Sequence, residues 1–288
     1  MKRCRRYAFP HKSFQEIFAA YYLCCELLEH ENTSESLVSD AAYFSELKQV
    51  LLFLCGILTV QCEERAVDLI TNITTQVNRF GQQTVPITLE CIAESKREQN
   101  NVHVKLARVF GSGLKLQNAR VEDITLRKVH IASVAEAMRV NTTLTKLALT
   151  NNNIDAAGAA SLAEATKVNT TLTKLLLSHN NIGDAGAASL AKAMKVNKTL
   201  TQLYLTRNNI GDAGTASLAE AMKVNTTLTK LDLSSNDIGA AGAASLAEAI
   251  EVNTTLTQVE LSNSNIGAAG AAFLAEAMKF NTTVTIKI

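Results

Sequence analysis

The sequence LTKLALTNNNI (144–154) returns as LTKLLLSHNNI (172–182), LTQLYLTRNNI (200–210), LTKLDLSSNDI (228–238) and LTQVELSNSNI (256–266), once every 28 residues. Each copy continues into a segment such as GDAGTASLAEAMKVNTT (211–227). A degenerate copy, LQNARVEDITL, precedes them at 116–126, and a sixth opening, VTIKI, ends the sequence at 284–288. A fixed period of this length indicates an array of stacked structural units.

Each copy predicts one short strand followed by one helix. Leu172, Leu175 and Leu177 include the alternation that is typical of a strand with one buried face. Leu190 and Met194 are four residues apart, as on one face of a helix. Because one strand and one helix cannot bury their apolar faces alone, the copies must stack. Strands lie about 4.8 Å apart and helices about 10 Å, so the stack should bend with its strands on the concave side.

Three sets of recurring residues have expected structural roles. An inward amide after each strand can hydrogen-bond the backbone of adjacent turns, and Ser264 interrupts this set: Asn152, Asn180, Asn208 and Asn236. A glycine recurs near each helix start, where a Cβ would crowd the neighbouring backbone: Gly158, Gly186, Gly214, Gly242 and Gly270. Asp184 and Asp212 are expected to be helix N-caps.

The copies resemble leucine-rich repeats of the ribonuclease-inhibitor type, and the resemblance covers residues 116–288. It implies an α/β fold, a leucine-rich-repeat horseshoe whose parallel sheet of six strands lies on the concave face. We therefore expect a leucine-rich-repeat domain at 113–288 with one degenerate repeat, five regular repeats and one terminal strand.

The first third of the chain has a different composition, because it holds both prolines and all six cysteines. Helical apolar patterns occupy residues 13–30, 43–60, 64–79 and 87–108. We expect an all-α helical domain at 1–112. Without a signal peptide, its cysteines are expected to be free, mostly buried thiols in a reducing compartment.

Three phrases in this helical region carry a second resemblance: FPHKSFQEIFAAYYL (9–23), VLLFLCGIL (50–58) and LECIAES (89–95). They are similar to the helical segment between the nucleotide-binding NACHT module and the repeats of NLR innate-immune receptors. No G-x-x-x-x-G-K-[ST] phosphate-binding loop occurs, and GSGLK (111–115) has the wrong spacing for one. Nucleotide would therefore act only through a NACHT module that this sequence lacks. The chain is expected to be a fragment of such a receptor, with a truncated relative as the alternative.

Several function classes are excluded by charge and composition. The 28 basic and 27 acidic residues give a net charge of +1, which lacks the basic footprint of nucleic-acid or anionic-membrane binding. The longest apolar run, Val50 to Val60, is too short to cross a bilayer and predicts a buried helix. We expect a cytoplasmic protein with no membrane association.

No enzyme is indicated. The histidines are scattered, with no nucleophile or paired carboxylate beside them: His11, His30, His103, His130 and His179. The repeat carboxylates lie 28 residues apart on successive helices and form a solvated outer face: Glu164, Glu220, Glu248 and Glu276. No Cys or His cluster has the spacing of a metal site. We predict no catalytic residues, no metal and no cofactor.

Asparagine sequons recur once in each copy, at Asn141, Asn169, Asn197, Asn225, Asn253 and Asn281. In a secreted protein they would accept glycans. Each also stands where a helix should end, and asparagine tolerates the left-handed conformation that is common there. We favour the helix-end role over glycosylation.

The candidate site is the outward-facing part of the concave sheet. One set of positions is nearly uniform and polar: Lys146, Lys174, Gln202, Lys230 and Gln258. Two further sets change in every copy: Ala148, Leu176, Tyr204, Asp232 and Glu260, then Asn151, His179, Arg207, Ser235 and Asn263. Variable side chains on a constant framework suit recognition of a protein or peptide partner, with neutral variation as the alternative. Tyr204 and Arg207 are the expected anchors.

The sequence thus predicts a non-enzymatic protein-interaction module. The resemblance implies the repeat end of an NLR-like innate-immune sensor or regulator. The concave face changes from apolar and basic at Leu176, Tyr204 and Arg207 to acidic at Asp232 and Glu260, so a partner with the opposite gradient is expected. Alternatives are a free-standing ribonuclease-inhibitor-like enzyme inhibitor and a Ran-type GTPase-activating protein.

Overall fold

The computed structural model describes residues 12–29, 48–80, 85–95, 101–122 and 128–288. The chain divides into two compact units, with the boundary between Gly113 and Leu114. The predicted fold class is confirmed: a leucine-rich-repeat horseshoe, with a parallel sheet on its concave face, follows an all-α region.

The first unit is built from helices that pack through aliphatic side chains. Its described helices are α1 (Lys12–Glu29), α4 (Lys48–Gln61), α5 (Glu63–Phe80), α6 (Val85–Glu94) and α7 (Val102–Gly113). Leu54, Ile70 and Ile92, from three of them, are fully buried. The five described cysteines are free thiols, and Cys24, Cys55 and Cys91 are buried.

The prediction of a single helix at 87–108 is wrong. The segment is divided between α6, which ends at Glu94, and α7, which starts at Val102. Ser95 forms a turn after α6, where its N–H donates to the Ile92 carbonyl at 3.1 Å. Residues 96–100 lie outside the described part of the chain, as do residues 43–47 of the helix expected at 43–60.

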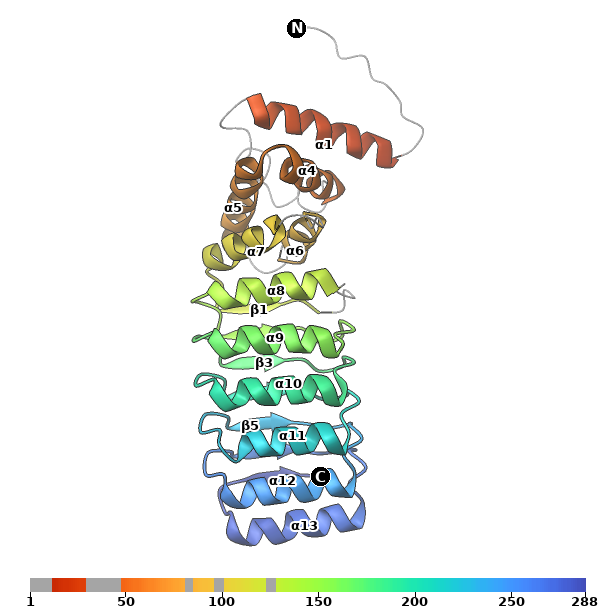
Figure 1. Ribbon diagram of the computed structural model, residues 1–288, viewed down its shortest axis with the longest axis vertical. Helices are drawn as coiled ribbons and strands as arrows, with labels where there is room; N and C mark the ends of the chain where they lie inside the picture. The colour runs from red at the N-terminus through yellow and green to blue at the C-terminus, as the bar shows by residue number, and fades with distance from the viewer. Residues whose placement is uncertain (1–11, 30–47, 81–84, 96–100, 123–127) are drawn as a thin grey trace. The chain divides into compact units, whose positions relative to one another are not determined.

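The second unit alternates strands and helices. Its strands are β1 (Asn118–Arg120), β2 (Lys146–Ala148), β3 (Lys174–Leu176), β4 (Gln202–Tyr204), β5 (Lys230–Asp232), β6 (Gln258–Glu260) and β7 (Thr285–Lys287). Its described helices are α8 (Lys128–Val140), α9 (Ala156–Val168), α10 (Gly183–Val196), α11 (Asp212–Met222), α12 (Gly239–Val252) and α13 (Gly267–Phe280). Figure 1 shows these helices stacked in chain order as one layer, with the strands behind them.

The sheet joins its strands in chain order, and each strand pairs in parallel with the next. Leu175, Leu203 and Leu231 share one register position and are fully buried between sheet and helices. The described sheet has seven strands rather than the expected six, because the degenerate copy contributes β1 through pairing with β2.

A first set of buried amides links the ends of the strands, as predicted. We call Asn152, Asn180, Asn208, Asn236 and Ser264 the strand-end ladder. Asn180 Nδ2 donates to the Leu149 carbonyl of the preceding repeat at 3.0 Å, and Asn180 Oδ1 accepts from the Asn152 N–H at 3.0 Å. Ser264 preserves one link, because its hydroxyl donates to the Leu233 carbonyl at 3.1 Å.

A second set of buried amides links the ends of the helices. We call Asn141, Asn169, Asn197, Asn225, Asn253 and Asn281 the helix-end ladder. Asn225 Nδ2 donates to the Met194 carbonyl of the preceding repeat at 2.6 Å, and Asn225 Oδ1 accepts from the Leu228 N–H at 2.7 Å. Four of these asparagines are helix C-caps, Asn169, Asn197, Asn253 and Asn281, whereas α11 ends at Met222 with Lys223 as its C-cap. The expected left-handed conformation is wrong. Asn197, for example, is extended, with φ −68° and ψ 136°. Its side-chain nitrogen is buried and bonded, so a glycan on it is incompatible with this fold.

The recurring glycines and aspartates bring successive helices together. A Cβ on Gly186 would lie 2.5 Å from Ile182 Cγ2 and 3.3 Å from the Ala156 backbone, which confirms the predicted crowding. The N-cap prediction for Asp184 needs correction. Its Oδ1 accepts from Gly211 N at 2.7 Å and Gly214 N at 3.0 Å, at the start of the next helix, α11. Asp212 likewise accepts from Gly242 N of α12. These caps connect repeats as well as satisfying helix ends.

Candidate functional site

The outward positions of the sheet form continuous rows across the concave face. Lys146 pairs in register with Lys174, Lys174 with Gln202, and Gln202 with Lys230. These side chains are half-buried, while the central residues of β2 to β6 are buried in the core. Strand spacing of about 4.8 Å brings the ammonium-bearing Lys146 and Lys174 side by side.

The two ends of this face differ in how their charges are satisfied. Among the described residues, the side chains of Lys146, Lys174 and Arg207 form no ion pair. Arg207 is exposed and Lys174 half-buried beside the half-buried Leu176. This half of the face therefore presents free positive charge next to apolar surface.

Tyr204 is held in place by its neighbours. Its hydroxyl donates to Gln202 Oε1 at 3.0 Å. The ammonium of Lys230 lies 5.3 Å from the centre of its ring, within the range of a cation–π interaction. An aromatic side chain that is ordered before binding loses less conformational entropy when a partner arrives.

The acidic end of the face is largely neutralised within the chain. Glu260 Oε1 lies 3.1 Å from Lys287 Nζ and 3.5 Å from Lys230 Nζ, and it accepts from Gln258 Nε2 at 2.6 Å. Burial raises the pKa of Glu260, but the hydrogen bond and charge of Lys287, together with Lys230, outweigh burial and lower it overall. Asp232 Oδ1 accepts from the Ser234 N–H at 3.0 Å. The expected acidic gradient is therefore weaker than the residue types imply.

Two sequence-based expectations about the site need correction. Ala148 is only 1% exposed, so its side chain offers no surface to a partner. The second variable set, which lies in the loops after the strands, is also constrained by the backbone, although its residues were expected to vary freely. Asn151, His179, Arg207, Ser235 and Asn263 all have a positive φ, between 53° and 59°. Asparagine tolerates this conformation well, whereas arginine and serine are uncommon in it.

A polar hollow beside these loop residues was not predicted from the sequence. It has a volume of about 540 Å³ and is lined by Asp184, Asn209, Gly211, Ser235, Asn236, Asp237, Asn263 and Asn265. Asn265 Nδ2 donates to Asp237 Oδ1 at 3.0 Å, and Asp184 caps α11. The recurrence of paired polar residues after each strand was the available signal.

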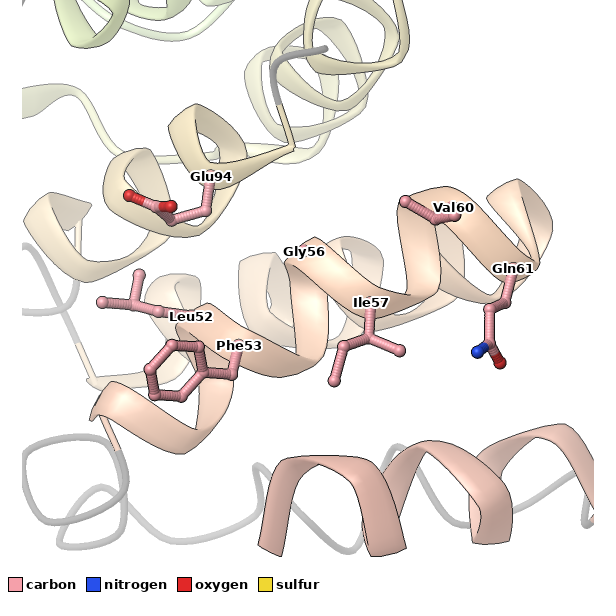
Figure 2. A pocket seen from close by; sticks show the side chains of 7 residues that line it. All are labelled: Leu52, Phe53, Gly56, Ile57, Val60, Gln61 and Glu94. Atoms are coloured by element: carbon pink, nitrogen blue, oxygen red, sulfur yellow. The ribbon is translucent and has the colours of Figure 1, made fainter. Parts of the chain in front are cut away.

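The helical unit has a second hollow of about 360 Å³ along α4, shown in Figure 2. Leu52, Phe53, Gly56, Ile57, Val60 and Gln61 line it from α4, and Glu94 lines it from α6. The run expected to be a buried helix is thus buried on one face, at Leu54 and Leu58, while Val60 is 67% exposed.

Within the described ranges, no group of three or more His, Cys, Asp or Glu side chains is placed to hold a metal ion. No helix of the described chain is both long and apolar enough to cross a bilayer.

Two family profiles match the repeats. One, described as "TMOD/LMOD Leucine-rich domain", matches residues 180–287, and another, described as "Leucine Rich repeat", matches residues 140–163 and 168–191. This chain contains a leucine-rich-repeat domain. Such domains use an extended concave surface for binding, so the repeat domain is a protein-interaction module.

Solved structures similar to the leucine-rich-repeat domain are distant. Leiomodin-1 Actin-Binding Site 2 is 26% identical, with a TM-score of 0.36, over 42% of this chain and 72% of that one. The C-terminal domain of tropomodulin from Caenorhabditis elegans is 18% identical, with a TM-score of 0.41, over 62% and 90%. A Bacteroides fragilis protein is 12% identical, with a TM-score of 0.28, over 62% and 66%. No curated protein sequence matches the chain.

Proposed function

We propose that the leucine-rich-repeat domain binds a protein or peptide partner on its concave face, with Tyr204 and Arg207 as anchors. The observation that carries this proposal is the unpaired positive charge of Lys146, Lys174 and Arg207 beside the apolar Leu176 and Tyr204. Exposed aromatic and arginine side chains are the residue types most enriched at interface hot spots. An acidic segment with apolar side chains is the partner chemistry that fits.

The remaining partner-binding residues are proposed to contribute less. His179 is exposed at the edge of the face. Gln202, Lys230 and Gln258 hold Tyr204 and Glu260 in place. Asp232 and Glu260 already have partners within the chain.

The test uses a library of displayed random peptides selected on the intact protein. The best peptide is then measured against two variants that borrow residues from the same rows, Tyr204→Leu as at Leu176 and Arg207→Asn as at Asn151. Asparagine keeps the positive φ while removing the guanidinium. We expect each variant to weaken binding at least about tenfold. The outer-face control Ser245→Ala should bind normally, and unchanged binding by both concave-face variants would refute the assignment.

A more specific setting is the repeat end of an NLR-like, cytoplasmic innate-immune sensor or regulator. The phrases at 9–23, 50–58 and 89–95, followed directly by ribonuclease-inhibitor-type repeats, support it. In this setting the chain has a helical domain at 1–112 and a repeat domain at 113–288. The two would act as separate modules of one receptor.

A second candidate function is actin binding, favoured by the match of residues 180–287 to the TMOD/LMOD leucine-rich domain. One of the similar solved structures is an actin-binding site of leiomodin-1. Sedimentation with filamentous actin and fluorescence anisotropy with monomeric actin test this candidate directly. Saturable binding that is lost in Arg207→Asn would support it, and absence of binding to both forms would exclude it.

A further inference from the structure

The outer surface of the helix layer carries a row of exposed apolar side chains. Val168, Val196, Val224, Val252 and Phe280 occupy the same position in successive repeats and are 53%, 53%, 55%, 59% and 71% exposed. Each is the last residue of its helix except Val224, which lies in the turn just after α11. Small residues lie on the same surface at the other end of these helices, including the exposed Ala185, Ala213 and Ala241. A contiguous apolar row on small-residue helices permits close approach of another protein surface.

The charges beside this row are arranged around α11, with a basic helix on one side and an acidic helix on the other. In α9, α11 and α13 the outer charges are balanced, because Glu164 pairs with Lys167, Glu220 with Lys223, and Glu276 with Lys279. In α10 the same two positions are both basic, Lys192 and Lys195. In α12 they are both acidic, Glu248 and Glu251. The basic and acidic helices thus flank α11, one on each side (Figure 1).

The unbalanced charges are accessible. Lys192 and Lys195 are exposed and form no ion pair among the described residues, and their charges only help to lower the pKa of Glu164 and Glu220 on the neighbouring helices. The nearby Lys198 adds a third exposed positive charge. Glu251 is exposed and equally free, while Glu248 lies 3.2 Å from Lys223. Both helices therefore have charge available for an outside partner.

We propose that two copies of this chain associate through the outer surfaces of α10, α11 and α12, related by a two-fold axis parallel to α11. This rotation reverses the order of the helices, so α10 faces α12 of the other copy. Lys192 and Lys195 then face the partner's Glu248 and the partner's Glu251, and Val224 meets the partner's Val224. Each contact occurs twice, as two-fold symmetry requires.

Charge selects this arrangement over the other face-to-face arrangement. A two-fold axis along the direction of stacking, passing through the apolar row, would instead place α10 antiparallel to α10 and α12 antiparallel to α12. Lys195 would then lie near the partner's Lys195, and Glu251 near the partner's Glu251. Like charges in contact oppose association. The apolar row supplies affinity in either arrangement, and the charges determine the orientation.

The proposed dimer is independent of the concave face. Because the outer surfaces meet, both concave faces remain open and the pair becomes bivalent. A partner with two copies of its binding segment would gain avidity without any new contact.

Sedimentation velocity of the full chain over a wide concentration range tests the proposal. We expect a reversible dimer that weakens as salt is raised, because the charge pairs are solvent-exposed. Lys192→Glu with Lys195→Glu should raise the dissociation constant at least about tenfold, and so should Glu248→Lys with Glu251→Lys. Circular dichroism melting establishes that each variant is folded.

Mixing the two charge-reversed variants tests whether these charges hold the two copies together. Each variant repels itself, but the acidic α10 of one faces the basic α12 of the other, so the mixture should dimerise again. A chain carrying all four reversals should also recover self-association. The control is Lys146→Glu, which reverses the charge of one lysine on the concave face and should dimerise normally.

A wild-type chain that stays monomeric at every concentration would overturn the proposal and leave this surface to a different protein. A dimer disrupted by Lys146→Glu but not by the α10 variant would overturn it too. So would a mixture of the two reversed variants that fails to associate.

Discussion

The helical unit and the repeat unit satisfy their buried polar groups in different ways. In the helical unit, Thr74 Oγ1 donates to the Ile70 carbonyl and Ser95 Oγ to the Cys91 carbonyl, both within or next to their own helix. In the repeat unit, buried amides such as Asn180 and Asn225 bond to carbonyls of the preceding repeat. The described helices of the first unit are joined by part-buried polar contacts, such as Lys48 with Glu90 and Asn78 Nδ2 with the Gly113 carbonyl. In the second unit, fully buried amides fix the register between neighbouring repeats.

This difference should appear first in a core truncation of the helical unit. Leu54 is fully buried in α4, so Leu54→Ala leaves a cavity and should cost about 3 kcal/mol. We expect faster amide hydrogen exchange throughout the helical unit and unchanged exchange in α9 to α13. The exposed Val60→Ala serves as the control, with an effect below about 0.5 kcal/mol. Equal loosening of both units would show that they do not behave as separate cooperative units.

Removing one amide of the helix-end ladder should instead raise amide hydrogen exchange in the repeat unit, across two neighbouring repeats. Asn225→Ala leaves the Met194 carbonyl and the N–H groups of Thr227 and Leu228 without their partner, which should cost about 2 kcal/mol. Because the amide joins two repeats, exchange should rise in α10 as well as α11. The exposed neighbour Thr226→Ala is the control in the same loop. An effect confined to α11 would argue against the ladder as a link between repeats.

The smallest expected effect concerns charge rather than amides. The lowered pKa of Glu260 means that its ion pairs stabilise the fold above the unfolded value of about 4.5. This stabilisation is lost as pH falls through the lower folded value. Urea unfolding between neutral and acidic pH should therefore show a smaller decrease for Glu260→Gln than for the wild type, by less than about 1 kcal/mol. An identical pH profile would show that the Lys287 and Lys230 contacts contribute nothing.

Sequence reasoning predicted the repeat unit well because one physical argument applies to each copy. The alternation around Leu175 and the four-residue spacing of Leu190 and Met194 were enough to place strand, helix and core. The inward role of Asn180 followed because a buried amide needs several partners. The helical unit lacks this redundancy, and a single pattern at 87–108 concealed the break between α6 and α7.

The errors arose where one repeat acts on the next. Capping rules are local, so Asp184 was assigned to a helix start, whereas its carboxylate reaches Gly211 and Gly214 of the following repeat. The positive φ of Arg207 and Ser235 could not be predicted from the sequence, because arginine and serine rarely adopt it. The opposite charges of Lys192 and Glu248, at equivalent positions of α10 and α12, were present in the sequence but were interpreted only as part of a solvated face. Only the stacking of the helices shows that the basic and acidic helices lie on opposite sides of α11.

Both asparagine ladders run along the direction in which the repeats stack, so they determine how the repeat unit responds to a pulling force. A force that pulls the ends of the stack apart would load these amide bonds together with the strand pairing, one junction at a time. Since neighbouring junctions are built from the same residue types, they should yield at similar forces. Each released 28-residue copy would add about 95 Å of extended chain. The repeat unit is therefore suited to lengthen under stretching in discrete steps.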